Sequence, residues 1–143
     1  MQKTTTVHDC AVIRLPNIES DRKGSLTYVY NNAHVPFAVR RVYYLYDVPA
    51  GSLRGGHAHK DLLQFIVAAS GSFDVIVRDG EESRTFSLNR PFYGLFIPCL
   101  IWRELTNFSG GSISLVLASL PYDEQDYLRD FGEFTRYKGG QPQ

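Results

Sequence analysis

The sequence predicts an all-β fold, a sandwich or barrel made of short strands. Short runs rich in Val, Ile, Phe and Tyr recur along the chain and are separated by Gly, Pro, Asn and Asp, which is the pattern of such folds. At 143 residues, with 43% hydrophobic residues, the chain is long enough to bury one core and short for a second domain. We therefore expect a single domain that spans residues 1–143.

The apolar runs predict the strands, and turn residues predict how two of them pair. Asp79-Gly80 favours a tight hairpin, because both residues tolerate the positive φ that a primed turn requires. The runs on either side of this turn are expected to pair antiparallel. The expected strands are Val7–Leu15, Ser25–Tyr30, Val39–Tyr46, Leu62–Ala69, Phe73–Arg78, Arg84–Leu88, Tyr93–Ile97, Ile101–Leu105 and Ser112–Ala118.

The pattern changes after Pro121. The residues from Tyr122 to Phe131 are acidic first and then apolar at helical spacing. Proline at the start of a helix and acids near the positive end of its dipole are both favourable. We expect one short C-terminal α-helix over residues 121–137, broken in part near Gly132.

The overall charge and the termini exclude several classes of partner. Lys and Arg together number 15, the same as Asp and Glu, so nothing favours nucleic acid or an anionic membrane. No segment approaches the roughly 18 apolar residues of a membrane span, and the N-terminus lacks an apolar signal core. We expect a cytoplasmic protein, with Cys10 and Cys99 as free thiols.

The strongest chemical signal is a pair of histidines, His57 and His59, in the segment Gly51-Ser52-Leu53-Arg54-Gly55-Gly56-His57-Ala58-His59. Residues two apart on an extended segment project to the same side, about 6.5 Å apart at Cα. Read on to Gly71, the segment resembles the first cupin motif, G-x5-H-x-H-x3,4-E-x6-G, with Gln64 in place of Glu. The two imidazoles therefore face one pocket, without the carboxylate of that motif.

The second cupin motif, P-x-G-x2-H-x3-N, is matched at its ends by Pro98 and Asn107, with Arg103 at the histidine position. A guanidinium stays protonated and offers only donors, so it repels a metal cation. Two histidines alone make a poor tetrahedral metal site. We expect no metal and no other cofactor, and we expect the histidines, with unperturbed pKa values near 6.5, to transfer protons.

A second strand supports this interpretation. Alternation puts Arg41 and Tyr43 on one face and Arg40, Tyr44 and Tyr46 on the other. Tyrosine offers an exchangeable proton, and the guanidiniums of Arg41, Arg54 and Arg103 match phosphate or polarised oxygens. Together these side chains indicate an anionic substrate rich in oxygen, such as a sugar phosphate.

The chain as a whole resembles the dTDP-4-dehydro-6-deoxyglucose 3,4-ketoisomerases, the WxcM-like cupin enzymes of bacterial deoxysugar and surface-polysaccharide (lipopolysaccharide, O-antigen) synthesis. The resemblance rests on Lys23-Gly24-Ser25-Leu26, Val35-Pro36-Phe37, Arg41-Val42-Tyr43-Tyr44, Arg54 to Lys60, Gly71-Ser72, Trp102, Leu117-Ala118-Ser119 and Tyr122 to Tyr127. It implies a metal-free homodimer of jelly-roll subunits, in which the N-terminal strands of residues 1–30 are exchanged.

The resemblance also implies a reaction and roles for residues. The enzyme converts dTDP-4-keto-6-deoxy-D-glucose into its 3-keto isomer through an enediol. His57 and His59 would transfer protons at carbon, with the order of the two rings left open, and Tyr43 would relay a proton between the two oxygens. Charge stabilisation and substrate binding fall to Arg41 and Arg54, with Lys23, Lys60, Gln64, Tyr93 and Arg103 as further candidates for binding or shaping the sugar pocket.

Two alternatives and one detail stay open at this point. The chain would also suit a sugar-nucleotide 3,5-epimerase, or a non-catalytic cupin that binds a sugar or nucleotide. The resemblance suggests that Lys23 and Arg103 influence product configuration at C4. Arg103 favours the gluco product, while Lys23 matches neither the relatives with gluco products nor those with galacto products.

Overall fold

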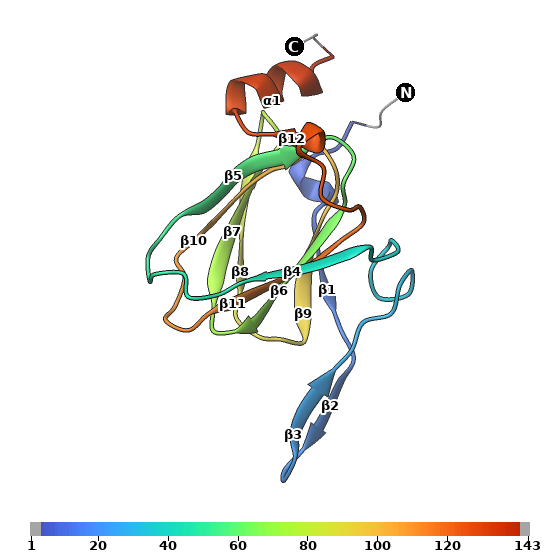
Figure 1. Cartoon of the computed structure of the whole chain (residues 1–143), viewed down its shortest axis with the longest axis vertical. Helices are drawn as coiled ribbons and strands as arrows, with labels where there is room; N and C mark the ends of the chain where they lie inside the picture. Colours follow the sequence, from blue (N-terminus) through green and yellow to red (C-terminus); the bar gives the residue numbers. More distant parts are fainter. Residues whose placement is uncertain (1–3, 141–143) are drawn as a thin grey trace.

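The computed structural model describes residues 4–140 as two facing antiparallel β-sheets with a short helix at one end (Figure 1). One sheet has the strand order β1-β9-β6-β11-β4, the other has the order β12-β5-β10-β7-β8, and β2 and β3 form a separate hairpin. The elements are η1 (Val7–Asp9), β1 (Ala11–Arg14), β2 (Asn17–Ser20), β3 (Gly24–Thr27), β4 (Arg41–Leu45), β5 (Arg54–His59), β6 (Gln64–Ser70), β7 (Phe73–Arg78), β8 (Ser83–Leu88), β9 (Tyr93–Ile97), β10 (Trp102–Thr106), β11 (Ile113–Ala118), η2 (Glu124–Asp126), β12 (Tyr127–Leu128) and α1 (Phe131–Lys138).

The main core lies between the two sheets and follows the alternation of the strands. On β7, Phe73, Val75 and Val77 are buried, while the residues between them are half-exposed. From the facing sheet, Ile66 and Leu95 pack into the same cluster. Period-2 burial of this kind is what a half-buried strand requires. The expected all-β jelly-roll fold with one short C-terminal helix is confirmed, and no helix within residues 4–140 is long and apolar enough to cross a membrane.

Most predicted strands are present with shifts of a few residues, and β7 and β9 have the predicted bounds. The exception is the first expected strand, Val7–Leu15. Its first three residues form the 3-10 turn η1, because Thr6 caps the turn and Asp9 accepts a hydrogen bond from the Thr6 amide in return. The strand β1 therefore starts only at Ala11.

The Asp79-Gly80 turn joins β7 to β8 as predicted, but it is a four-residue loop and not a two-residue primed turn. The last cross-strand pair is Arg78 with Ser83. Gly80 supplies the positive φ, 101°, and the Asp79 carboxylate closes the loop by accepting from the amides of Glu81 and Glu82 at 2.9 and 2.8 Å.

The predicted helix over residues 121–137 is wrong in its first half. Residues Glu124–Asp126 form a 3-10 turn, and Tyr127 and Leu128 then pair with the edge of β5 as β12. The α-helix begins only at Phe131, where the Asp130 side chain accepts a hydrogen bond from the Glu133 amide at 2.9 Å and caps it. Pairing with β5 thus replaces the helical turns that the acidic and apolar spacing favoured.

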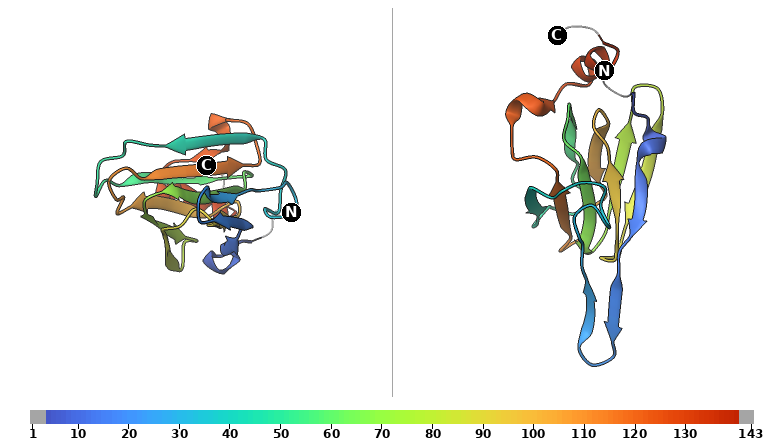
Figure 2. Two further views of the ribbon diagram at one scale, coloured as in Figure 1. Left: turned by 90° about the horizontal axis from the view of Figure 1, so that it is seen from below. Right: turned by 90° about the vertical axis from the view of Figure 1, so that its right-hand side faces the viewer.

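The β2–β3 hairpin extends away from the two sheets (Figure 2). Ile18 and Leu26 lie directly opposite each other on it, and both are more than half exposed. Behind it, the chain from Val29 to Val39 returns across the outer face of the first sheet, where Val35 and Phe37 are buried against Phe65. The hairpin therefore carries apolar residues that its own chain does not cover.

Asp79 ties η1 to the hairpin turn between β7 and β8, so its loss is expected to destabilise the fold. Besides the two loop amides, the carboxylate accepts from the Val7 amide at 2.9 Å. Asp79→Ala leaves these amides without partners, and we predict a loss of about 2 kcal/mol in the free energy of unfolding. Urea denaturation measures it, with the exposed Glu81→Ala in the same loop as control.

This contribution should also depend on pH. Burial raises the pKa of Asp79, but the three backbone amides that donate to it outweigh this, and the pKa is lowered. Because the folded pKa lies below the unfolded value, near 3.9, the stabilisation is complete above that value. It is lost as the pH falls through the folded pKa. An equal acid sensitivity of Asp79→Ala and wild type would contradict this role.

Candidate active site

Two glycines bring β5 close to β10 and set the direction of the histidines. Gly55 and Gly56 have φ of 104° and 71°, which L side chains rarely adopt. A Cβ on Gly55 would come within 3.2 Å of the Arg103 carbonyl oxygen. Gly56 is an extra residue of β5 at this point, and His57 lies opposite Arg103 next to this bulge.

The side chains that point into the barrel here line a pocket of about 360 Å³. The lining residues come from both sheets and from the segment after η2, so residues far apart in the sequence meet here only in the tertiary structure. The lining residues are Arg41, Tyr43, Leu45, Arg54, Gly55, His57, Gln64, Ile66, Arg103, Leu105, Val116, Tyr127 and Arg129.

The two histidines touch, but only one of them lines the pocket. Their ring centroids are 4.9 Å apart at an interplanar angle of 88°. His57 is half-buried on the pocket wall, whereas His59 is 0% exposed. The ring of Tyr127 covers both, at 5.2 Å from His57 and 4.4 Å from His59. A ligand in the pocket therefore meets His57 first.

A carboxylate orients the inner histidine. Nδ1 of His59 lies 3.0 Å from Oδ2 of Asp126, and the other oxygen of Asp126 accepts from the Asp61 amide at 2.8 Å. A carboxylate only accepts hydrogen bonds, so Nδ1 is the nitrogen that carries the proton in neutral His59. Nε2 then has a free lone pair, and this atom is buried without a partner among the described residues.

Both histidines are neutral near pH 7. Burial lowers the pKa of His57 to about 2, and the positive charges of Arg103 and Arg129 lower it further. Burial lowers the pKa of His59 as well, but its hydrogen bond to Asp126 opposes this and the pKa is about 4. His57 is thus a neutral ring that gives up any acquired proton readily.

The pocket holds positive charge that carboxylates do not neutralise. Arg103 is fully buried, and its two terminal nitrogens donate to the Gln64 side-chain oxygen and to the Ile101 carbonyl at 3.1 Å. Nε of Arg103 and both Nε and Nη2 of Arg41 are buried without partners in the described part of the chain. Unsatisfied buried donors are costly, and an anion with several oxygens would satisfy them.

The segment after η2 contributes another guanidinium. Arg129 lines the pocket, lies over the Tyr127 ring at 4.1 Å and forms a bidentate ion pair with Glu124 at 2.6 and 2.8 Å. The ion pair is half exposed to solvent, so it is worth little stability by itself. Its effect is to hold Arg129 on the pocket wall beside Tyr127.

The sequence predictions agree with the pocket for His57, Tyr43, Arg41, Arg54, Gln64 and Arg103, which all line it. Three predicted binding residues lie elsewhere in the chain. Strand alternation turns Lys60 away from the histidines, and its amine lies 5.1 Å from the Tyr137 ring. Tyr93 points to the Asn89 side chain, to which it donates a hydrogen bond. Lys23 lies in the exposed turn of the β2–β3 hairpin.

Sequence reasoning missed Asp126, Tyr127, Glu124 and Arg129 as members of the site. The signal is present, because the resemblance includes the acidic segment from Tyr122 to Tyr127, but the local pattern of that segment predicts a helix. Its function depends on pairing with β5, which no local pattern indicates.

The residues present do not suit a metal ion. Gln64 and Arg103 occupy the positions of the carboxylate and the third histidine of the cupin motifs, and a guanidinium has no lone pair to offer. Within the described residues, no group of three or more His, Cys, Asp or Glu side chains comes together in a way that could hold a metal. The absence of a metal remains a prediction.

Comparison with known proteins gives one consistent set of relatives. The family model described as FdtA: WxcM-like, C-terminal, matches residues 8–139. A TDP-4-oxo-6-deoxy-alpha-D-glucose-3,4-oxoisomerase from Aneurinibacillus thermoaerophilus is 40% identical over 117 residues, which are 82% of this chain and 84% of that protein.

Solved structures point the same way. The TDP-quinovose 3,4-ketoisomerase WlaRB from Campylobacter jejuni is 45% identical, with a TM-score of 0.86 over 91% of this chain and 99% of that one. A mutant of the 3,4-ketoisomerase QdtA from Thermoanaerobacterium thermosaccharolyticum, in complex with TDP-4-keto-6-deoxyglucose, is 34% identical, with a TM-score of 0.89 and coverage of 94% and 96%. An RmlC epimerase from Mycobacterium tuberculosis, 17% identical, shares the fold at a TM-score of 0.74, over 90% of this chain and 74% of that one.

The contact between His59 and Asp126 predicts how the inner ring changes when the carboxylate is removed. In Asp126→Asn the negative charge that raises the pKa of His59 is lost, so we expect this pKa to fall below its value of about 4. We also expect the preference for a proton on Nδ1 to weaken. Long-range proton–nitrogen NMR spectra of the imidazoles measure both quantities. Asp123→Asn, in the same segment and exposed, is the matched control; an unchanged His59 spectrum in Asp126→Asn would contradict the assignment.

Proposed function

This chain belongs to the FdtA family of WxcM-like proteins, and on that premise we propose that it is a sugar-nucleotide 3,4-ketoisomerase. Its substrate is dTDP-4-keto-6-deoxy-D-glucose and its product the corresponding 3-keto sugar. The observation that carries the proposal is a neutral histidine, His57, on the wall of a pocket with unpaired guanidinium donors. A neutral base beside fixed positive charge suits removal of a proton next to a carbonyl.

In the proposed reaction, His57 removes the proton from C3, which the neighbouring C4 carbonyl acidifies. The enediol that forms then takes a proton at C4, and the carbonyl moves to C3. His59 packs against His57 and is held by Asp126, so it supports and orients the ring that faces the substrate. Tyr43 relays the proton between the two sugar oxygens.

The guanidiniums stabilise the charges of the substrate. Arg103 and Arg41 reach the pocket with buried nitrogens that lack acceptors among the described residues, so developing negative charge on the enediolate meets donors already in position. Arg54 and Arg129 lie on the pocket wall with exposed side chains and are suited to the diphosphate, which guanidiniums bind as a fork.

We further propose the gluco configuration at C4 of the product and a role in deoxysugar and surface-polysaccharide synthesis in the cytoplasm. Quinovose is 6-deoxyglucose, and the chain is 45% identical to a TDP-quinovose 3,4-ketoisomerase. Arg103, the residue after Trp102 that the resemblance connected with this configuration, lies fully buried against the pocket.

The reaction is tested by incubating chelator-treated protein with dTDP-4-keto-6-deoxyglucose in deuterated water and following the sugar carbons by NMR. We expect deuterium at C4 together with a new C3 carbonyl. His57→Asn should lower kcat by about 10³, within the range for loss of a general base, while the exposed His8→Asn should not change it. Exchange at C3 or C5 without migration of the carbonyl would indicate an epimerase, and neither exchange nor migration of the carbonyl would indicate a binding protein.

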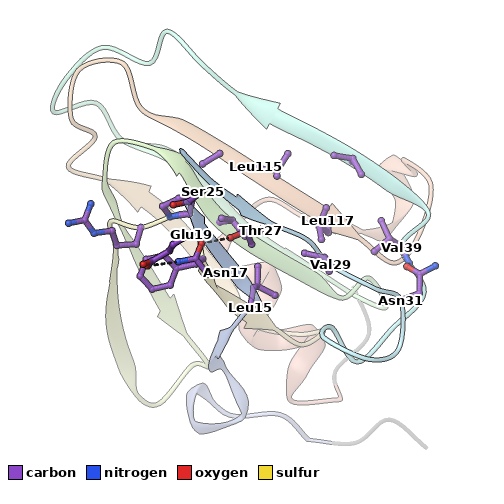
Figure 3. Close-up of a pocket in the computed structure, with 16 residues that line it drawn as sticks. Leu15, Asn17, Glu19, Ser25, Thr27, Val29, Asn31, Val39, Leu115 and Leu117 are labelled. Carbon is purple, nitrogen blue, oxygen red and sulfur yellow. Dashed lines mark hydrogen bonds between the residues drawn. The ribbon is translucent and has the colours of Figure 1, made fainter. Parts of the chain in front are cut away.

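We also propose a homodimer in which the β2–β3 hairpin is exchanged. A second, larger groove of about 660 Å³ lies between this hairpin and the outer face of the first sheet, away from the histidines (Figure 3). Val29, Val39, Leu115 and Leu117 line it. The hairpin turns Asn17, Glu19, Ser25 and Thr27 toward this groove, whereas Ile18 and Leu26 lie on its opposite, exposed face. A second copy that exchanges the hairpin would cover the apolar residues of that face and of the sheet.

In such a dimer the tip of the hairpin reaches the partner, and Lys23 enters a site only by that route. Exchange would also give a partner to the free edges of β2 and β3, which are otherwise open to pairing. This arrangement accounts for the position of Lys23 far from the pocket of its own chain.

Light scattering after size exclusion tests the dimer. Wild type is expected at twice the chain mass of 16.2 kDa. Ile18→Glu with Leu26→Glu puts two charges on the apolar face of the hairpin and should shift the protein to the monomer. Leu53→Glu, similarly exposed at 64% but in the loop before β5 and not on the hairpin, is the control. A wild-type monomer, or a double variant that stays dimeric, would contradict the proposal.

A further inference from the structure

A chain of hydrogen bonds crosses the pocket from Arg103 through Gln64 to Tyr43. Nη1 of Arg103 donates to Oε1 of Gln64, and Nε2 of Gln64 donates to the Tyr43 hydroxyl at 3.0 Å. The three residues come from β10, β6 and β4, so this row of hydrogen bonds connects the two sheets. Gln64 and Arg103 are each 1% exposed, and Tyr43 is half-buried.

Arg103 determines which atom donates and which accepts in each of these hydrogen bonds. A guanidinium offers only donors, so the group of Gln64 that faces Arg103 must be the amide oxygen. The amide nitrogen then necessarily faces Tyr43 and donates to it. The Tyr43 oxygen is therefore an acceptor in this contact, and its own proton points away from Gln64.

That proton has no acceptor among the described residues, in which the Tyr43 hydroxyl takes part only in the bond from Gln64. Tyr43 lines the pocket beside His57. Burial raises the pKa of Tyr43, and Arg103 and Gln64 only partly offset this, so the hydroxyl is protonated near pH 7. The free tyrosine is thus a donor whose proton is available to an oxygen of a ligand in the pocket.

We propose that Gln64 is a positioning residue that directs the hydroxyl proton of Tyr43 into the pocket and stabilises its oxygen when that proton has left. This inference rests on the proposed function. It gives a reason for an amide at the position where the cupin motif has a carboxylate. A carboxylate there would accept from Tyr43 and turn its proton away from the substrate.

The proton balance of the reaction shows what Gln64 contributes. As His57 removes the C3 proton, the C–H electron pair forms the C3–C4 double bond and the carbonyl pair moves to O4, which takes the proton of Tyr43. The phenolate now accepts a stronger hydrogen bond from Gln64, next to the charge of Arg103. It then takes the proton from O3, the carbonyl forms at C3, C4 takes a proton from solvent, and the His57 imidazolium releases its proton to solvent. Both residues end as they began.

Gln64→Glu tests the direction of the hydrogen bond, with Gln64→Met as its matched partner. The carboxylate introduced by Gln64→Glu keeps the size of the side chain and the contact to Arg103, but accepts from Tyr43 instead of donating. The thioether introduced by Gln64→Met fills similar volume and leaves the hydroxyl of Tyr43 free. Loss of one donor to a developing oxyanion costs about 10²–10³ in kcat, so we expect kcat to fall about 100-fold in Gln64→Glu and less in Gln64→Met.

A purely structural role predicts the opposite order of activities, because the carboxylate of Gln64→Glu pairs with Arg103, whereas Gln64→Met leaves that guanidinium without its acceptor. We therefore expect Gln64→Glu to have the higher melting temperature and the lower kcat of the two variants. The affinity for TDP, measured by calorimetry, should change by less than about threefold in both, since Gln64 acts on Tyr43 and not on the diphosphate.

The Tyr43→Phe background isolates the pathway. If Gln64 acts through the hydroxyl, replacing Gln64 in that background should change kcat by less than about threefold. Equal activity of wild type and Gln64→Glu, a lower kcat in Gln64→Met than in Gln64→Glu, or a full effect in the Tyr43→Phe background would each overturn the inference while the ketoisomerase function stands. A wild-type enzyme without turnover would overturn the proposed function and this inference together.

Discussion

The buried charge of Arg103 is the constraint on which the rest of the pocket depends. Removing a guanidinium from water costs several kcal/mol, and no carboxylate among the described residues pairs with it. Its two terminal nitrogens are held by the Gln64 oxygen and the Ile101 carbonyl. Burial lowers its pKa to about 10, which still leaves it charged near pH 7. The fold thus holds a permanent cation beneath the substrate pocket.

This cation explains the state of its neighbours. It keeps His57 and His59 neutral by adding to the effect of burial, and it makes the Gln64 amide face Tyr43 with its nitrogen. In the metal cupins a divalent ion would occupy this region, bound by imidazoles and a carboxylate. Here Arg103 supplies positive charge in this region from a side chain. In the proposed reaction the lone pairs of the imidazoles serve proton transfer at carbon.

Local pattern was a reliable guide wherever alternation alone decides the direction of a side chain. Arg41 and Tyr43 face the pocket while Val42 and Tyr44 are exposed, as the period of a strand requires. The same rule puts His57 and His59 on one face of β5, where their rings are in contact. It was a poor guide for the segment from Tyr122 to Arg129, whose acidic and apolar spacing resembles a helix. There a hydrogen bond between Asp126 and a distant histidine and pairing with β5 outweigh the helical propensity.

The sequence by itself determined the fold class, the pair of histidines, the substitution of two residues of the cupin metal motifs and six residues of the pocket, because strand periodicity, motif spacing and side-chain chemistry are local properties. Only the tertiary structure decided that His57 meets the pocket and His59 lies behind it, that Asp126 and Arg129 belong to the site, and that Lys23, Lys60 and Tyr93 do not line the pocket of their own chain. Those facts depend on which strands pair with each other and on which face of each sheet is buried by other parts of the chain. Residues 67 positions apart, such as His59 and Asp126, meet only when the sheet edge is complete.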